Sequence, residues 1–174
     1  MVLPRRLVEA RAQKLLAHLG FDEIPVPVDR VAKSLGARLR YSPLDEELSG
    51  FIFIKDGTPI IGINSLHHPN RQRFTIAHEI GHLQLHPEFI TNTVHVDKQF
   101  AESVLKRDTS SAAGIERLEV EANQFAAALL MPGLILDRLL KQSPIDIEDG
   151  GVMEAWAKGF VVSRAALQYR IRNL

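Results

Sequence analysis

The sequence predicts an α+β fold, in which a small antiparallel sheet packs on a helical core and a bundle of helices follows at the C-terminal end. Two β-rich runs flank Asp56-Gly57, a pair typical of a tight type I′ turn, and so predict a hairpin. Two long segments with apolar residues at helical spacing predict the core helices. A length of 174 residues with 45% hydrophobic residues suits one domain, residues 1–174.

Each predicted helix ends near a residue that disfavours its continuation, and the predicted strands are rich in β-branched and aromatic residues. Gly20, Gly36 and Pro87 end three helices, and Pro132-Gly133 ends the longest. The predicted helices cover residues 4–19, 29–35, 71–86, 115–131, 134–141, 152–158 and 163–172, and the predicted strands cover 37–41, 51–54, 59–63, 94–96 and 104–107. Residues 64–70 and the Ser-, Asp-, Ala- and Gly-rich segment 108–114 are predicted loops.

The charge balance and the absence of cysteine exclude several classes of protein. Lys+Arg and Asp+Glu each number 21, so no overall field attracts the chain to nucleic acid or to an anionic membrane. Without cysteine there are no disulfides and no thiolate ligands, which leaves His, Glu and Asp to bind a transition metal. No apolar run approaches a membrane span, and charged residues interrupt the N-terminal segment where a signal peptide needs an apolar region. We therefore expect a cytoplasmic protein.

The most informative stretch is His78-Glu79-Ile80-Gly81-His82, an HExxH motif inside a predicted buried helix. Histidines at i and i+4 lie one turn apart on one face, where both imidazoles can reach a single Zn²⁺ ion. Glu79 is then placed to accept a proton from a water molecule that the metal activates, which is the chemistry of zinc peptidases. With 7 His in the chain, the expected number of accidental matches is about 0.02.

A catalytic zinc site usually has three protein ligands, so a third donor must come from another element. The helix over residues 115–131 offers Glu116, Glu119 and Glu121. Residues two apart on a helix point about 200° away from each other, so Glu119 and Glu121 cannot both face the metal. Asn123 favours Glu119, because it lies at i+4 on the same face, where its amide could hydrogen-bond a ligand imidazole. Glu121 remains the alternative ligand.

The other histidines carry weaker signals. His86 lies one turn after His82 and is either an extra donor at the edge of the site or a cap on the helix C-terminus. The predicted positions of His67, His68 and His95 are in loops or at an edge, so we expect each to be a solvated side chain. Candidates for a donor to the oxyanion are His86, His95 and Tyr41, and a strand over residues 94–96 could align an extended substrate.

With HEIGH, the lead-in RQRFTIAHE and the downstream ERLEVEANQFAAALLMP, the chain resembles the ImmA/IrrE family of metallopeptidases. The resemblance implies a gluzincin-like enzyme with a zincin-type helical core, in which the helix after HExxH carries an E-x-x-x-D/N ligand motif. In this chain that motif falls on Glu119 and Asn123. The resemblance also implies a cytoplasmic zinc-dependent endopeptidase that cleaves a helix-turn-helix repressor or an antitoxin-like partner, with a role in transcriptional regulation or a toxin–antitoxin pair.

The C-terminal part raises two further expectations. Compared with the family, we expect no sensor domain after Leu174, and Val161 stands where a glycine is expected. Residues 155–170, within a helical segment over about 134–174, also have a helix-turn-helix cadence.

A DNA-binding regulator would use Ser163, Arg164, Gln168 and Arg170 of this segment. The zero net charge instead favours helices that pack on the core, so DNA binding is not expected. The other rival, a non-proteolytic partner-binding module with a metal site, is disfavoured by Glu79, because a structural zinc site needs no base.

Overall fold

The structure, a computed structural model, describes residues 3–92, 95–98, 109–142 and 150–174. The described elements, in chain order, are α1 (Arg5–Leu19), α2 (Val28–Ser34), β1 (Arg38–Ser42), β2 (Leu48–Lys55), β3 (Thr58–Asn64), α3 (Pro69–Leu85), α4 (Pro87–Asn92), β4 (His95–Lys98), α5 (Thr109–Leu130), α6 (Gly133–Gln142), α7 (Gly150–Phe160) and α8 (Arg164–Arg172). The predicted α+β class is confirmed.

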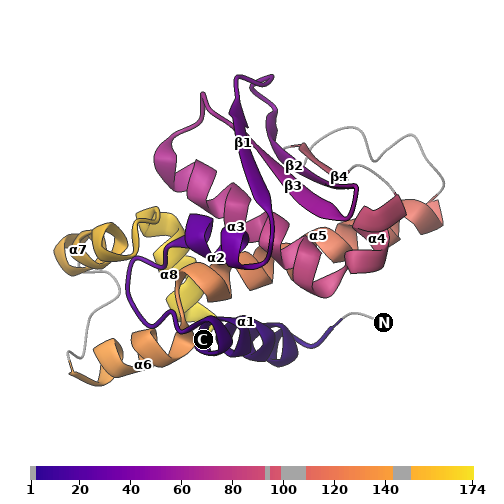
Figure 1. Cartoon of the computed structure of the whole chain (residues 1–174). Helices are drawn as coiled ribbons and strands as arrows, with labels where there is room; N and C mark the ends of the chain where they lie inside the picture. The colour runs from indigo at the N-terminus through magenta and orange to yellow at the C-terminus, as the bar shows by residue number, and fades with distance from the viewer. Residues whose placement is uncertain (1–2, 93–94, 99–108, 143–149) are drawn as a thin grey trace.

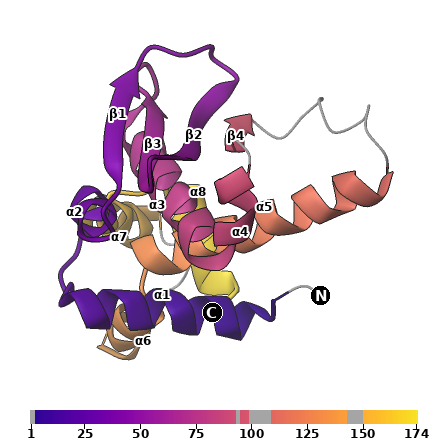
Figure 2. The same cartoon turned by 45° about the vertical axis from the view of Figure 1, so that its right-hand side comes forward.

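α3 is the centre of the architecture, with the sheet on one side and α5 on the other (Figures 1 and 2). α1 packs on α5, and α6 to α8 gather at the end of the molecule away from the β2–β3 turn (Figure 1). Ile76 and Ile80 of α3 are buried, as are Phe125 and Leu129 of α5. Burial of each such side chain contributes about 1.5–3 kcal/mol, so the contact between these two helices is a main part of the core.

The four strands lie in the order β1-β3-β2-β4. β2 and β3 form the predicted hairpin, and both turn residues have positive φ, 49° at Asp56 and 74° at Gly57, as a type I′ turn requires. β4 pairs antiparallel with β2, whereas β1 pairs parallel with β3, so the sheet is mixed rather than purely antiparallel. The chain reverses once between β1 and β2 and again at the hairpin, and two reversals leave β1 and β3 pointing the same way.

Most predicted element boundaries agree with the structure within a few residues. The main difference is the segment after residue 108, which was expected to be a loop up to Gly114 but belongs to α5 from Thr109 onwards. Ser residues are favoured at helix starts and Ala is the strongest helix former, so the small-residue run 109–113 extends the helix. The predicted strand over residues 104–107 lies outside the described residues. Among the described ranges, no helix combines the length and hydropathy needed to cross a bilayer.

Arg170 ties the C-terminal helices to the rest of the fold. Its side chain is 1% exposed, its Nε donates to the Met131 carbonyl at 3.2 Å, and its Nη1 donates to the Glu9 carboxylate of α1 at 2.5 Å. Arg170 is therefore a buried structural residue, whereas the helix-turn-helix interpretation would require an exposed side chain that contacts DNA. Ser163, another residue of that reading, caps α8 by accepting from the Ala166 amide at 3.1 Å.

Val161, where a glycine was expected, lies between α7 and α8 with φ of 54°. This left-handed conformation suits glycine and is unfavourable for a β-branched residue, because Cβ approaches the following carbonyl. The expectation of glycine therefore had a backbone reason, although this chain adopts the turn with valine.

Candidate metal centre

The two motif histidines lie in the buried middle of α3. This helix starts with Pro69 in its first turn, capped by the His68 side chain, which accepts from the Asn70 amide at 3.2 Å. His78 and His82 are 2% and 0% exposed, and their Nε2 atoms are 3.0 Å apart. The i, i+4 spacing therefore does bring the two imidazoles to one point.

Glu119 of α5 completes a three-residue cluster with them. One carboxylate oxygen lies 3.2 Å from His78 Nε2 and the other lies 3.3 Å from His82 Nε2. Zinc bonds of about 2.0–2.1 Å at tetrahedral angles place ligand atoms about 3.3 Å apart, which matches these separations. The residues present therefore fit a Zn²⁺ ion, and the His78, His82 and Glu119 group could bind a metal.

The Nδ1 atoms of both histidines have other partners, so their Nε2 atoms are the ones directed at the cluster. His78 Nδ1 lies 2.9 Å from the Asn123 side-chain oxygen. Since a carboxamide oxygen only accepts, His78 carries its proton on Nδ1 and presents the Nε2 lone pair. Asn123 thus lies where the i+4 relation to Glu119 placed it.

His86 lies at the end of α3, one turn after His82. Its backbone amide donates to the His82 carbonyl at 2.8 Å, and among the described residues its ring contacts side chains and not a helix carbonyl. The ring lies between His82 Nδ1, at 3.2 Å, and the Glu121 carboxylate, at 3.0 Å from His86 Nε2. Burial lowers the pKa of the His86 imidazole below its usual value, although Glu121 acts in the opposite direction.

Glu121 therefore points to His86 and not to the cluster. Its second oxygen accepts from the Leu3 backbone amide at 2.8 Å, and Arg117 Nε lies 3.7 Å away. Burial acts to raise the pKa of Glu121, but the hydrogen bonds from His86 and Leu3, together with Arg117, outweigh it and leave the pKa below its usual value. Sequence reasoning missed the pairing of His86 with Glu121. The available signal was spacing, because His86 follows His82 by four residues and Glu121 follows Glu119 by two.

Two glycines allow the close packing around the site. A Cβ on Gly81 would lie 3.1 Å from both Cα and the carbonyl oxygen of Ala122, so α3 and α5 touch at backbone distance inside the motif. A Cβ on Gly50 of β2 would lie 2.4 Å from Thr75 Cγ2 and 3.7 Å from Glu79 Oε1. Glu79, which is 0% exposed, is therefore covered by the sheet next to the cluster.

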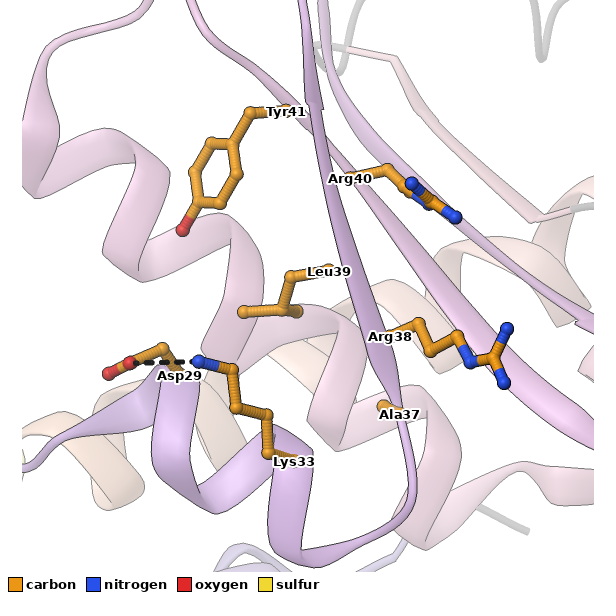
Figure 3. A pocket seen from close by; sticks show the side chains of 7 residues that line it. All are labelled: Asp29, Lys33, Ala37, Arg38, Leu39, Arg40 and Tyr41. Atoms are coloured by element: carbon orange, nitrogen blue, oxygen red, sulfur yellow. Dashed lines mark ion pairs between the residues drawn. The ribbon is translucent and has the colours of Figure 1, made fainter.

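Of the remaining candidates, the structure describes the side chains of Tyr41 and His67. Tyr41 is on the outer strand β1 and lines a cavity of about 560 Å³ between β1 and α2, with Asp29 and Lys33 (Figure 3). Burial is the main cause that raises the pKa of the Tyr41 phenol, and the negative charge of Asp29 raises this pKa further. The His67 ring lies 3.0 Å from the Glu46 carbonyl. The backbone of His95 is in β4, and its side chain lies outside the described structure.

A known protein family matches most of the chain. The family described as Peptidase_M78, the IrrE N-terminal-like domain, matches residues 32–172, a span that includes both α3 and α5. The chain belongs to this family. The resemblance to ImmA/IrrE proteins is thus confirmed, and this IrrE-like chain has a metallopeptidase-like domain.

Two individual relatives extend the comparison. Uncharacterized immunity region protein 2 of Bacillus phage phi105 is 32% identical over 110 residues, 63% of this chain and 61% of that protein. A Mycobacterium tuberculosis transcriptional regulator has the same fold, with a TM-score of 0.62 and 18% identity over 93% of this chain and 45% of that chain. The IrrE-like chain spans less than two thirds of the length of either relative.

Proposed function

We propose that this IrrE-like chain is a cytoplasmic zinc-dependent endopeptidase, carried by one domain over residues 1–174. The observation that supports this most is the convergence of His78, His82 and Glu119 at spacings of 3.0–3.3 Å beside the buried Glu79. Three protein ligands leave one position open, as in catalytic rather than structural zinc sites. A carboxylate next to such a site is suited to proton transfer.

His78, His82 and Glu119 would hold the ion, and Asn123 would orient His78. Zinc, when bound, supplies a Lewis acid that makes water acidic and polarises the peptide carbonyl. Glu79 accepts the proton of the attacking water and delivers it to the nitrogen of the leaving amine, so it is a base in one step and an acid in the next. The sheet over Glu79 limits access of bulk water to this carboxylate.

The proposed substrate is a protein, specifically a helix-turn-helix repressor or an antitoxin-like partner. An immunity region protein among the relatives and a transcriptional regulator with the same fold are consistent with a role in regulation. β4 is an outer strand of the described sheet and pairs with β2 from Leu48 to Ile52, near Gly50. An extended substrate segment could pair with the outer edge of β4, which would align it along the sheet that covers Glu79.

The test incubates the zinc-loaded protein with the product of its neighbouring gene and maps any fragments by mass. Glu79→Gln keeps the size of the side chain but removes the base, so we expect cleavage to fall about 10²–10⁴-fold with stoichiometric zinc retained. His82→Ala is expected to lose both zinc and cleavage. Cleavage at the wild-type rate by zinc-loaded Glu79→Gln would show that Glu79 is not the base, and unchanged zinc content in His82→Ala would refute the site.

A further inference from the structure

A buried chain of hydrogen bonds leads from the His78, His82 and Glu119 cluster to the backbone of Leu3, just before α1. It runs from His82 Nδ1 to His86 Nδ1 at 3.2 Å, from His86 Nε2 to Glu121 at 3.0 Å, and from Glu121 to the Leu3 amide at 2.8 Å. We propose that His86 and Glu121 are positioning residues that hold His82 in the tautomer and orientation that bind the metal, with the Leu3 amide fixing the outer carboxylate oxygen. This inference rests on the metal site of the proposed function.

The direction of every hydrogen bond follows from the requirement for metal binding. His82 faces the cluster with Nε2, so as a ligand it must carry its proton on Nδ1. That proton needs an acceptor, which makes His86 Nδ1 the unprotonated nitrogen. A neutral His86 then carries its proton on Nε2 and donates it to Glu121. Only this arrangement gives each hydrogen bond one donor and one acceptor, because the Glu121 carboxylate cannot donate.

Burial makes this arrangement effective. His82, His86 and Glu121 are 0%, 7% and 2% exposed, so water can hardly replace a missing partner. A ligand histidine whose second nitrogen donates to a carboxylate, directly or through another group, is fixed in orientation and is a more basic ligand. The other ligand, His78, has the neutral amide of Asn123 at this position, so the carboxylate-backed chain serves His82 alone.

Glu121→Gln tests the chain with almost no change in volume. A glutamine has one accepting oxygen and one donating NH₂, whereas both oxygens of Glu121 accept. If the NH₂ faces His86, the proton pattern reverses and His82 must carry its proton on Nε2, where it blocks the metal. If the NH₂ faces Leu3, it opposes the Leu3 amide proton. Either orientation weakens the support of His82.

The experiment is a titration with Zn²⁺ against a chromophoric chelator, with the fold checked by circular dichroism. Loss of such outer support typically weakens metal binding 10–100-fold, and we expect this for Glu121→Gln and for His86→Leu. Arg117→Gln is the matched control, since it removes the other charged neighbour of Glu121 but leaves the chain from His82 intact. We expect its zinc affinity to stay within about threefold of the wild type.

A second series separates positioning from packing. The side-chain oxygen of His86→Asn can replace His86 Nδ1 as the acceptor, so this variant should bind zinc more tightly than His86→Leu. In the zinc-loaded wild type, long-range ¹H–¹⁵N spectra should show protons on His82 Nδ1 and His86 Nε2. Wild-type affinity in folded His86→Leu, equal weakening by leucine and asparagine, or a proton on His86 Nδ1 would each overturn the inference. If the wild type binds zinc but cleaves nothing, only the peptidase proposal fails.

Discussion

Replacing Gly50 by alanine is expected to destabilise the protein by about 2 kcal/mol, because an added Cβ has no room between the Thr75 side chain of α3 and the backbone of β3. A Cβ at this position would be 2.4 Å from Thr75 Cγ2 and 2.6 Å from the Gly62 carbonyl oxygen, whereas ordinary contacts begin at 3.4 Å. Thr75 is 1% exposed and Gly62 O belongs to the neighbouring strand, so neither can move freely. Overpacking of this kind costs roughly 1–3 kcal/mol, offset in part by the smaller backbone entropy of alanine in the unfolded chain.

A loss of about 2 kcal/mol corresponds to a fall in Tm of roughly 4–8 °C for a chain of this size. Thermal and urea unfolding followed by circular dichroism would measure it. Gly159→Ala in α7 is the matched control, since no atom lies within 4 Å of its added Cβ. The control should be more stable than the wild type by about 0.5–1 kcal/mol, because alanine is the better helix former.

The pair Gly50→Ala and Thr75→Ser identifies the contact responsible. The serine lacks the Cγ2 methyl group and so relieves one of the two close approaches. The double variant should therefore be more stable than the sum of the single changes predicts, by about 0.5–1 kcal/mol. An unchanged Tm for Gly50→Ala, or strict additivity in the pair, would refute the account of how the sheet packs on α3.

Three further predictions concern the site and the C-terminal helices. Glu119→Ala should abolish stoichiometric zinc binding, whereas Asn123→Ala should weaken it about tenfold; equal zinc affinity for both variants in a chelator titration would contradict the roles assigned to them. Glu9→Ala leaves the buried Arg170 guanidinium without its carboxylate and should lower the free energy of unfolding by about 3 kcal/mol in urea, and a change below 1 kcal/mol would contradict the buried pair. Val161→Gly should raise the urea midpoint by the equivalent of about 0.5 kcal/mol, and a lower midpoint would argue against the left-handed turn.

Local patterns predicted much of the fold, including the helix that carries the motif histidines. The His78 and His82 pairing follows from helix geometry alone, and the hairpin turn from the conformational preference of Asp56-Gly57. The choice of Glu119 over Glu121 needed one further step, since helix geometry shows which residues share a face.

The rest depended on how elements cross in space, which periodicity does not specify. The helix face shows that Glu121 points away from the cluster, but not that α5 crosses α3 so that this carboxylate meets His86. The Leu3 amide is a backbone donor 118 positions away, and a backbone group has no signature in the sequence. The parallel pairing of β1 with β3 was missed for a similar reason, because β1 skips its neighbour in sequence.

The backbone contact at Gly81 changes how an HExxH pattern is searched for. The two middle positions are usually treated as uninformative, yet in this architecture the second one, Gly81, lies against Cα of Ala122, three residues beyond Glu119. A pattern that admits only small residues at this position, and again three residues after a downstream glutamate, would select chains whose two helices approach this closely. Such a filter uses the geometry of the helix pair. It would separate proteins in which the two helices pack at backbone distance from proteins that share only the two histidines.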